Sequence, residues 1–207
     1  MIKVKVCGLT DPGNILSVAE AGADYLGFIF YKGSKRYAYN LRPVDLQLLP
    51  PSIIKTGVFV NEKIEVLLET AFRFNLDMIQ LHGEEDRDYC SRVRDEGFLV
   101  IKVFGIDGSE IPTAVNSFTD VCDFFLFDTM SAERGGTGKK FDWSVLDEQN
   151  IPIPFFLSGG IAPGDINKIL KIKNNNLWGV DINSLFESEL GIKDVSKVRE
   201  FINEIKR

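Results

Sequence analysis

A chain of 207 residues with 44% hydrophobic content has enough apolar material for one domain with a complete core. Its charged fraction of 26% and aromatic fraction of 11% exclude an intrinsically disordered protein. The net charge of −6 argues against nucleic acid and anionic membrane surfaces as partners. A small anionic ligand remains compatible, because backbone N–H groups at helix N-termini can bind phosphate locally.

The cysteine and histidine content narrows the chemistry further. Three scattered cysteines, at positions 7, 90 and 122, do not form a disulfide framework or a CxxC motif, and a single histidine argues against a zinc site. The N-terminus lacks the apolar stretch of a signal peptide, and no apolar run approaches the roughly 18–20 residues of a membrane span. We therefore expect a cytoplasmic globular protein without a metal centre.

Short apolar runs alternate with amphipathic segments along the chain. Strands are predicted at residues 2–7, 25–30, 53–60, 78–82, 98–104, 123–128, 154–158 and 178–182. Helices are predicted near 12–22, 43–50, 61–75, 84–96, 110–121, 142–149, 163–173 and 194–205. Aspartates at 24, 77 and 123 precede three of the strands, and we interpret them as turn or cap residues on the face opposite the active site.

Alternating strands and helices predict a parallel sheet with right-handed crossovers, and eight units predict an α/β fold, a single-domain (β/α)8 TIM barrel over 1–207. The alternative is a doubly wound open sheet. That fold would need a glycine-rich loop after the first strand, and CGLTDPGN (7–14) does not match GxGxxG.

Active sites in such barrels lie at the carboxyl ends of the strands, where Cys7 and Asp128 are predicted to lie. Alternation along the first strand turns Cys7 toward the barrel axis together with Lys5. A thiol and a carboxyl that face each other across a pocket can act as base and acid. The alternatives are that Cys7 is a packed small residue and that Asp128 only caps the next loop.

Other polar residues follow the strands. Loops after the last two strands often bind phosphate in this fold, which suggests that role for four residues: Gly159, Gly160, Asn183 and Ser184. The glycine-rich loop at 131–143 is predicted to be a mobile lid. Arg36 either receives a carboxylate with two hydrogen bonds or is a solvated surface residue.

Three further residues are also informative. Lys5 and Asp181 lie on neighbouring strands of a closed barrel and are predicted to form a core ion pair. His82 either lines the pocket or donates a structural hydrogen bond, and we favour the second interpretation.

Ten ordered motifs are distributed along nearly the whole chain: KVCGLTD (5–11), GADYLGFIF (22–30), SKR (34–36), GVFVN (57–61), IQLHGEE (79–85), LFDT (126–129), GGTGKKFDW (135–143), LSGGIAPGDI (157–166), GVDINS (179–184) and GIKD (191–194). In this order they resemble the phosphoribosylanthranilate isomerase family. The resemblance implies an Amadori rearrangement in tryptophan biosynthesis, an aromatic amino acid biosynthesis pathway, acting on a phosphorylated small molecule without a cofactor.

The resemblance also implies residue roles. It places the general base at Cys7, the general acid at Asp128 and the arginine that binds the substrate carboxylate at Arg36. Phosphate binding falls on the loops that contain Gly159, Gly160, Asn183 and Ser184, with no metal. Members of the family occur as monomers and dimers, so a monomer or homodimer is expected.

The chain departs from the family pattern at two positions. Lys35 replaces a common proline, which should loosen its loop. Leu185 replaces a glycine after Ser184, so we expect either crowding of the anion or a positive φ at leucine, with a local rearrangement.

Two other functions stay open at this point. One is a different phosphate-binding barrel enzyme, such as a sugar-phosphate epimerase or a synthase from the same pathway. Such epimerases usually bind a metal through histidines and acids, so a single histidine argues against them. The other is a non-catalytic protein that binds a phosphorylated ligand.

Overall fold

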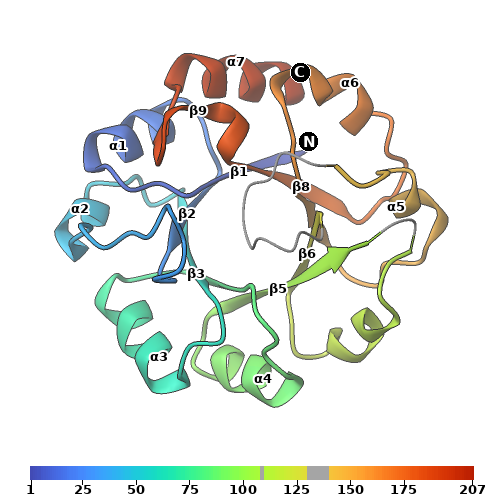
Figure 1. Ribbon diagram of the computed structural model, residues 1–207, viewed down its shortest axis with the longest axis horizontal. Helices are drawn as coiled ribbons and strands as arrows, with labels where there is room; N and C mark the ends of the chain where they lie inside the picture. Colours follow the sequence, from blue (N-terminus) through green and yellow to red (C-terminus); the bar gives the residue numbers. More distant parts are fainter. Residues whose placement is uncertain (108–109, 130–139) are drawn as a thin grey trace.

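The strands form a closed parallel barrel in the order of the sequence, surrounded by helices (Figure 1). The computed structural model describes residues 1–107, 110–129 and 140–207. The barrel strands are β1 (Lys3–Cys7), β2 (Tyr25–Ile29), β3 (Ile54–Phe59), β4 (Met78–Leu81), β5 (Leu99–Ile106), β6 (Phe124–Thr129), β7 (Phe155–Leu157) and β8 (Leu177–Ile182). Because β1 pairs with both β2 and β8, the predicted TIM barrel is confirmed and the open sheet is excluded.

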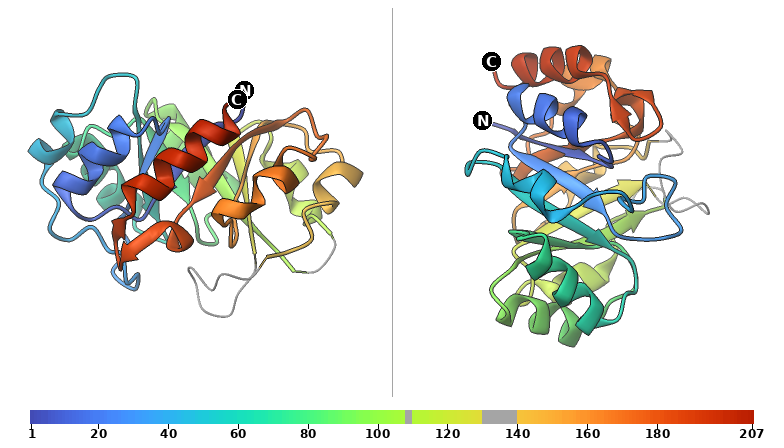
Figure 2. Two further views of the ribbon diagram at one scale, coloured as in Figure 1. Left: turned by 90° about the horizontal axis from the view of Figure 1, so that it is seen from above. Right: turned by 90° about the vertical axis from the view of Figure 1, so that its left-hand side faces the viewer.

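The helices occupy the predicted positions but are mostly shorter. The α-helices are α1 (Pro12–Glu20), α2 (Pro43–Gln47), α3 (Ile64–Arg73), α4 (Arg87–Asp95), α5 (Val145–Glu148), α6 (Ile166–Ile169) and α7 (Val195–Ile205). Short 3₁₀ helices are η1 (Thr113–Phe118), η2 (Pro163–Asp165) and η3 (Ser184–Phe186). α7 packs beside α1, and the two chain ends lie close together (Figure 2). No helix in the described ranges combines the length and apolarity of a membrane span.

Two of the predicted helices contain 3₁₀ turns in place of a continuous α-helix. The segment predicted at 110–121 forms only the 3₁₀ helix η1, because Thr113, Val115 and Asn116 are weak helix formers. The segment predicted at 163–173 divides into η2 and the single turn of α6. Both segments still connect consecutive strands on the outside of the barrel.

The aspartates that precede β2, β4 and β6 have a common structural role. Asp24 accepts a hydrogen bond from the backbone N–H of Val4 at 2.9 Å, and Asp77 accepts one from Lys55 at 2.8 Å. Asp123 accepts the equivalent bond from the N–H of Val100 at 2.8 Å. Each carboxylate therefore ties the start of one strand to the strand before it, as the sequence predicts for cap residues opposite the active site.

Apolar side chains fill part of the barrel interior. A cluster of large apolar residues packs there: Tyr25, Met78, Ile101, Val103, Leu126 and Phe156. A larger apolar core lies between the strands and the helices. This filling leaves the carboxyl ends of the strands as the place for polar chemistry.

A short antiparallel hairpin after β8 was not predicted. It consists of β9 (Glu187–Glu189) and β10 (Ile192–Lys193), in which Lys193 pairs with Glu187. The hairpin precedes α7 and brings two buried charged side chains to the end of the barrel that carries Cys7.

Candidate active site

The predicted reactive residues lie at one end of the barrel. Because the strands are parallel, their carboxyl ends meet on one face. Cys7 ends β1 and Asp128 is the penultimate residue of β6. His82, Gly159 and Asn183 come one or two residues after β4, β7 and β8. The strand ends therefore bring together a thiol, a carboxyl, an imidazole and a glycine turn.

Cys7 is buried next to two residues that the sequence assigns to substrate binding. Gly8 has a φ of 76°, which strongly favours glycine. A Cβ at Gly8 would lie 2.6 Å from Cδ of Arg36 and 2.7 Å from Oδ1 of Asn183. The side chains of Arg36 and Asn183 thus pass directly over the residue that follows the thiol, and only glycine leaves them room.

The charges around Cys7 act on its thiol in opposite directions. Burial raises the pKa of Cys7 above its usual value, and the carboxylate of Asp181 adds to this effect. The ammonium groups of Lys5 and Lys193 oppose the rise by favouring the thiolate. Nζ of Lys5 lies 2.9 Å from Oδ2 of Asp181, which confirms the predicted core ion pair. The free protein therefore holds Cys7 mainly as the thiol, with two cations available to stabilise the anion.

Asp128 has the environment of an acid that keeps its proton to a higher pH than an exposed carboxyl does. Its Oδ1 accepts a hydrogen bond from the N–H of Thr129 at 2.8 Å, and its side chain is 26% exposed. Burial, with the negative charge of Asp181, raises the pKa of Asp128 to about 6. A carboxyl with such a pKa is suited to general acid catalysis.

His82 lies next to Asp128. Nε2 of His82 is 3.7 Å from Oδ2 of Asp128, and Nδ1 of His82 is 3.2 Å from the side-chain nitrogen of Gln80. The favoured interpretation was that His82 donates a structural hydrogen bond, whereas in the contact with Gln80 the amide nitrogen is the donor and Nδ1 of His82 accepts. The imidazole also lines the site beside the candidate acid.

The predicted phosphate loop after β7 turns through two glycines with positive φ, 91° at Gly159 and 64° at Gly160. A Cβ at Gly159 would lie 2.8 Å from the backbone nitrogen of Thr129 and 3.1 Å from Oδ1 of Asp128. A side chain at Gly159 would therefore strain the backbone and push against the candidate acid.

After β8, the second predicted phosphate loop contains Asn183 and Ser184. Oδ1 of Asn183 accepts a hydrogen bond from Nζ of Lys193 at 2.6 Å, and Ser184 is the first residue of η3. Of the two alternatives for Leu185, a positive φ is excluded, since this residue is the exposed middle residue of η3 and keeps a negative φ. A 3₁₀ turn accommodates leucine without backbone strain.

Arg36 is not a solvated surface residue. Its Nε and Nη2 donate to the two carboxylate oxygens of Glu187, both at 2.6 Å. The same carboxylate accepts a hydrogen bond from Nζ of Lys193 at 2.8 Å. Sequence reasoning missed both Glu187 and Lys193, although Lys193 lies within one of the recognised motifs, GIKD.

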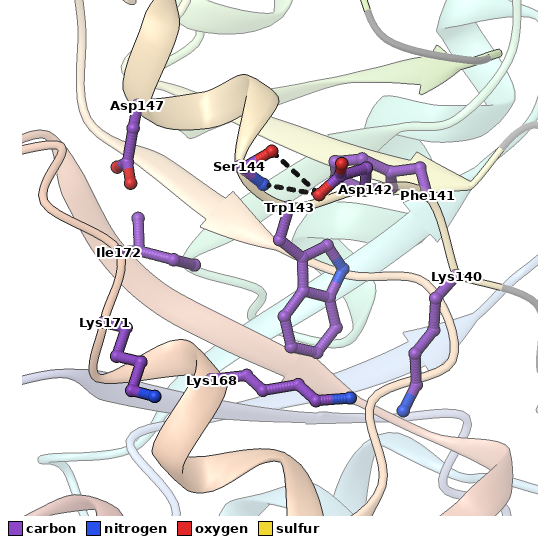
Figure 3. Close-up of a pocket in the computed structure, with 9 residues that line it drawn as sticks. All are labelled: Lys140, Phe141, Asp142, Trp143, Ser144, Asp147, Lys168, Lys171 and Ile172. Atoms are coloured by element: carbon purple, nitrogen blue, oxygen red, sulfur yellow. Dashed lines mark hydrogen bonds between the residues drawn. The ribbon is translucent and has the colours of Figure 1, made fainter.

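Residues 131–139 of the predicted lid (131–143) lie outside the described part of the chain. A pocket of about 430 Å³ lies at α5 and α6, and its lining includes Trp143, Lys140, Lys168 and Lys171 (Figure 3). It includes none of the predicted site residues. In the described ranges, no group of three potential ligands among His, Cys, Asp and Glu is placed to hold a metal ion.

Comparisons with known proteins agree with this arrangement. A family model described as N-(5'-phosphoribosyl)anthranilate (PRA) isomerase matches residues 4–204. An N-(5'-phosphoribosyl)anthranilate isomerase of Phocaeicola vulgatus is 42% identical over 204 residues, covering 99% of this chain and 98% of the relative. The Thermotoga neapolitana isomerase is 37% identical, with 100% and 99% covered.

Solved structures give the same result. The phosphoribosyl anthranilate isomerase of Thermotoga maritima superposes with a TM-score of 0.85 at 36% identity, covering 100% of this chain and 99% of that one. A structure of phosphoribosyl anthranilate isomerase in complex with reduced 1-(o-carboxyphenylamino)-1-deoxyribulose 5-phosphate superposes with a TM-score of 0.79 at 32% identity, with 100% and 99% covered. The chain therefore belongs to the N-(5'-phosphoribosyl)anthranilate isomerase family.

Proposed function

We propose that this protein carries out the reaction of its family with Cys7 as general base and Asp128 as general acid. The protein is an isomerase of tryptophan biosynthesis that converts N-(5-phosphoribosyl)anthranilate to 1-(o-carboxyphenylamino)-1-deoxyribulose 5-phosphate. The observation that carries the residue assignment is the raised pKa of Asp128, about 6 because of burial and of the charge of Asp181, at the same barrel end as Cys7.

The proposed chemistry is a sequence of proton transfers. Asp128 donates its proton to the furanose ring oxygen, the bond between that oxygen and C1′ breaks, and a protonated Schiff base forms. The Cys7 thiolate then takes the proton from C2′, and the electron pair moves into the imine to give an enolamine. The enolamine gains a proton at C1′ and loses one from the 2′-hydroxyl, which gives the ketone. Solvent restores the proton to Asp128 and removes it from Cys7.

This chemistry needs a protonated acid together with a deprotonated base. The pKa of Asp128 is about 6, whereas burial raises the pKa of Cys7 above its usual value. Only a small fraction of the free enzyme holds the productive combination at any pH. Lys5 and Lys193 increase that fraction, because their positive charges favour the thiolate.

Substrate binding is assigned to the residues around this pair. We place the anthranilate carboxylate at Arg36, whose stem crosses Gly8 beside Cys7. The phosphate is assigned to the loops after β7 and β8, at Gly159, Gly160, Asn183 and Ser184. The positive φ values of the two glycines support this assignment, because they keep side chains out of the turn.

The proposal also covers cofactor use, domain extent, location and partners. An internal redox exchange needs no external electron acceptor, and proton transfer needs only the two side chains, so we propose catalysis without a cofactor or metal. We place this activity in one catalytic domain, 1–207, in the cytoplasm, with no nucleic acid or membrane partner. A monomer or a homodimer is proposed, since the structure of a related isomerase is described as dimeric.

Turnover of the substrate tests this proposal. The purified protein should convert N-(5-phosphoribosyl)anthranilate with loss of the substrate's fluorescence, and prior treatment with a chelator should leave the rate unchanged. Loss of activity on chelation would contradict the metal-free mechanism and favour an epimerase-like enzyme. Tight binding of the reduced product analogue without any turnover would instead favour a binding protein.

A further inference from the structure

The arginine assigned to the substrate carboxylate already holds a carboxylate of its own chain. Glu187 takes two parallel hydrogen bonds from Nε and Nη2 of Arg36, both at 2.6 Å. This is the side edge of the guanidinium group. Nη1 and the second N–H of Nη2 form the other edge, which points away from the side-chain stem and has the same fork geometry.

Glu187 is held firmly in this position. Its side chain is 8% exposed, and its Oε1 also accepts hydrogen bonds from Nζ of Lys193 at 2.8 Å and from the N–H of Gly191 at 3.2 Å. Lys193 is itself fixed, because its backbone N–H and C=O both bond to the side chain of Asn14 at 2.8 Å. Removing Glu187 from Arg36 would break buried charged hydrogen bonds on both sides, so a ligand has little prospect of displacing it.

The charges in this cluster leave one positive charge unmatched. Arg36 and Lys193 carry two cations and Glu187 supplies one anion. The cluster lies beside Cys7, because the stem of Arg36 crosses Gly8. A single further carboxylate, placed on the end edge of Arg36, would complete both the charge balance and the hydrogen bonding.

We propose that Glu187, supported by Lys193, is a positioning residue that fixes Arg36 so that its end edge receives the carboxylate of the substrate. Glu187 thereby makes the enzyme selective for arylamine substrates that carry an ortho carboxylate. This inference rests on the proposed role of Arg36 in substrate binding. In the opposite arrangement Glu187 competes with the substrate carboxylate for Arg36, so Glu187 must leave Arg36 before the substrate binds.

The two arrangements predict opposite effects for Glu187→Gln. If Glu187 positions Arg36, affinity for a carboxylated ligand falls in this variant, because the amide nitrogen cannot accept a hydrogen bond and Arg36 loses its two-bond partner. If Glu187 instead occupies the place of the substrate carboxylate, the variant holds that place less strongly and affinity for a carboxylated ligand rises.

The test compares two stable ligands, the reduced product analogue and the same compound without its carboxyl group. Calorimetry gives the two Kd values for wild type, Glu187→Gln, Arg36→Met and the control Glu189→Gln, an exposed glutamate on the same strand. We expect wild type to prefer the carboxylated ligand and Glu187→Gln to lose about tenfold of this preference, as one charged hydrogen-bonding partner suggests. Glu189→Gln should keep the preference, and KM in the isomerase assay should change more than kcat in Glu187→Gln.

The ratio of the two Kd values separates the possible failures. An equal loss for both ligands in Glu187→Gln, or tighter binding of the carboxylated one, would overturn the positioning role. If Arg36→Met retains the wild-type preference, the proposed role of Arg36 itself is wrong. Because both ligands are measured on the same sample, an inactive fraction does not alter the ratio. If Glu187→Gln does not fold, Glu187→Asp is read in the same way, with a smaller expected loss.

Discussion

Lys5 and Asp181 join the two strands that close the barrel, with Nζ of Lys5 2.9 Å from Oδ2 of Asp181. The side chain of Lys5 is fully buried and that of Asp181 is 7% exposed. Cys7 lies two residues further along the same face of β1, and both charges act on its thiol. The ion pair therefore belongs to the core and to the electrostatics of the site.

Breaking this pair should destabilise the protein strongly. Lys5→Met leaves Asp181 as an unpaired buried carboxylate, and we expect a loss of about 3–5 kcal/mol in the free energy of unfolding. The double variant with Asp181→Asn removes the unpaired charge and should recover a large part of that loss. Urea unfolding of wild type, both single variants and the double variant measures the coupling. Additive losses in the double variant would show that the two groups do not interact.

Asp128→Asn should stabilise the folded protein above pH 6. Burial and the charge of Asp181 raise the pKa of Asp128 to about 6 in the folded state. Between the unfolded and the folded pKa the folded state binds more protons, so wild-type stability falls as pH rises through this window. Above it the wild type is weaker by up to about 3 kcal/mol, a cost that the asparagine variant does not carry. Urea unfolding at pH 4 and pH 7.5 measures the difference.

The control for this experiment is Asp120→Asn, an exposed carboxylate paired with Arg87. Because the hydrogen bond from Arg87 lowers the pKa of Asp120, this variant should lose stability, and the loss should be no smaller at pH 7.5 than at pH 4, which is opposite in sign to the effect of Asp128→Asn. An Asp128→Asn variant that is no more stable than wild type at pH 7.5 would contradict the raised pKa.

Lys193→Met should make the Cys7 thiol less acidic. Lys193 is buried, and its positive charge lowers the pKa of Cys7, which burial raises. The rate of alkylation by iodoacetamide at Cys7, followed by mass spectrometry against pH, should shift to higher pH in the variant. Lys197→Met, on the surface of α7, is the matched control and should not shift it. An unchanged alkylation profile in Lys193→Met would show that this cation does not act on the thiol.

The pH dependence of kcat/KM should be flat between two widely separated limbs. Below about pH 6 Asp128 is protonated, and kcat/KM should fall tenfold for each unit by which the pH is lowered, because the Cys7 thiolate is lost. Between the two pKa values each gain in thiolate is offset by a loss of protonated Asp128. Above the pKa of Cys7, which burial raises, the rate should fall again. A steady decline from pH 6 upward would contradict thiolate catalysis.

The sequence predicts the barrel well because its signals are local. Each strand is a short apolar run next to a turn, and caps such as Asp11 before Pro12 mark helix starts, so the predicted strands agree with the structure to within two residues at each end. Cys7 and Asp128 could be placed at one barrel end for the same reason, since parallel strands fix which end of each strand faces the site.

The contacts that define the environment of the site were not predictable in the same way. Arg36 and Glu187 are 151 residues apart, and nothing in either local sequence indicates that they pair. The β9–β10 hairpin is too short for a periodic signal, and it is the element that brings Glu187 and Lys193 to the site. At Leu185 the sequence left a positive φ open as one alternative, and the structure excludes it because the 3₁₀ turn changes the local backbone without needing glycine.

The most direct test of the central claim separates binding from proton transfer at Cys7. Cys7→Ala and Asp128→Asn are assayed for turnover of N-(5-phosphoribosyl)anthranilate and for binding of the reduced product analogue, with Cys90→Ala, a buried cysteine on α4, as the control. We predict that both site variants bind the analogue while their kcat falls by about 10²–10⁴, and that Cys90→Ala retains its kcat. Undiminished turnover in Cys7→Ala or Asp128→Asn would contradict the proposed mechanism.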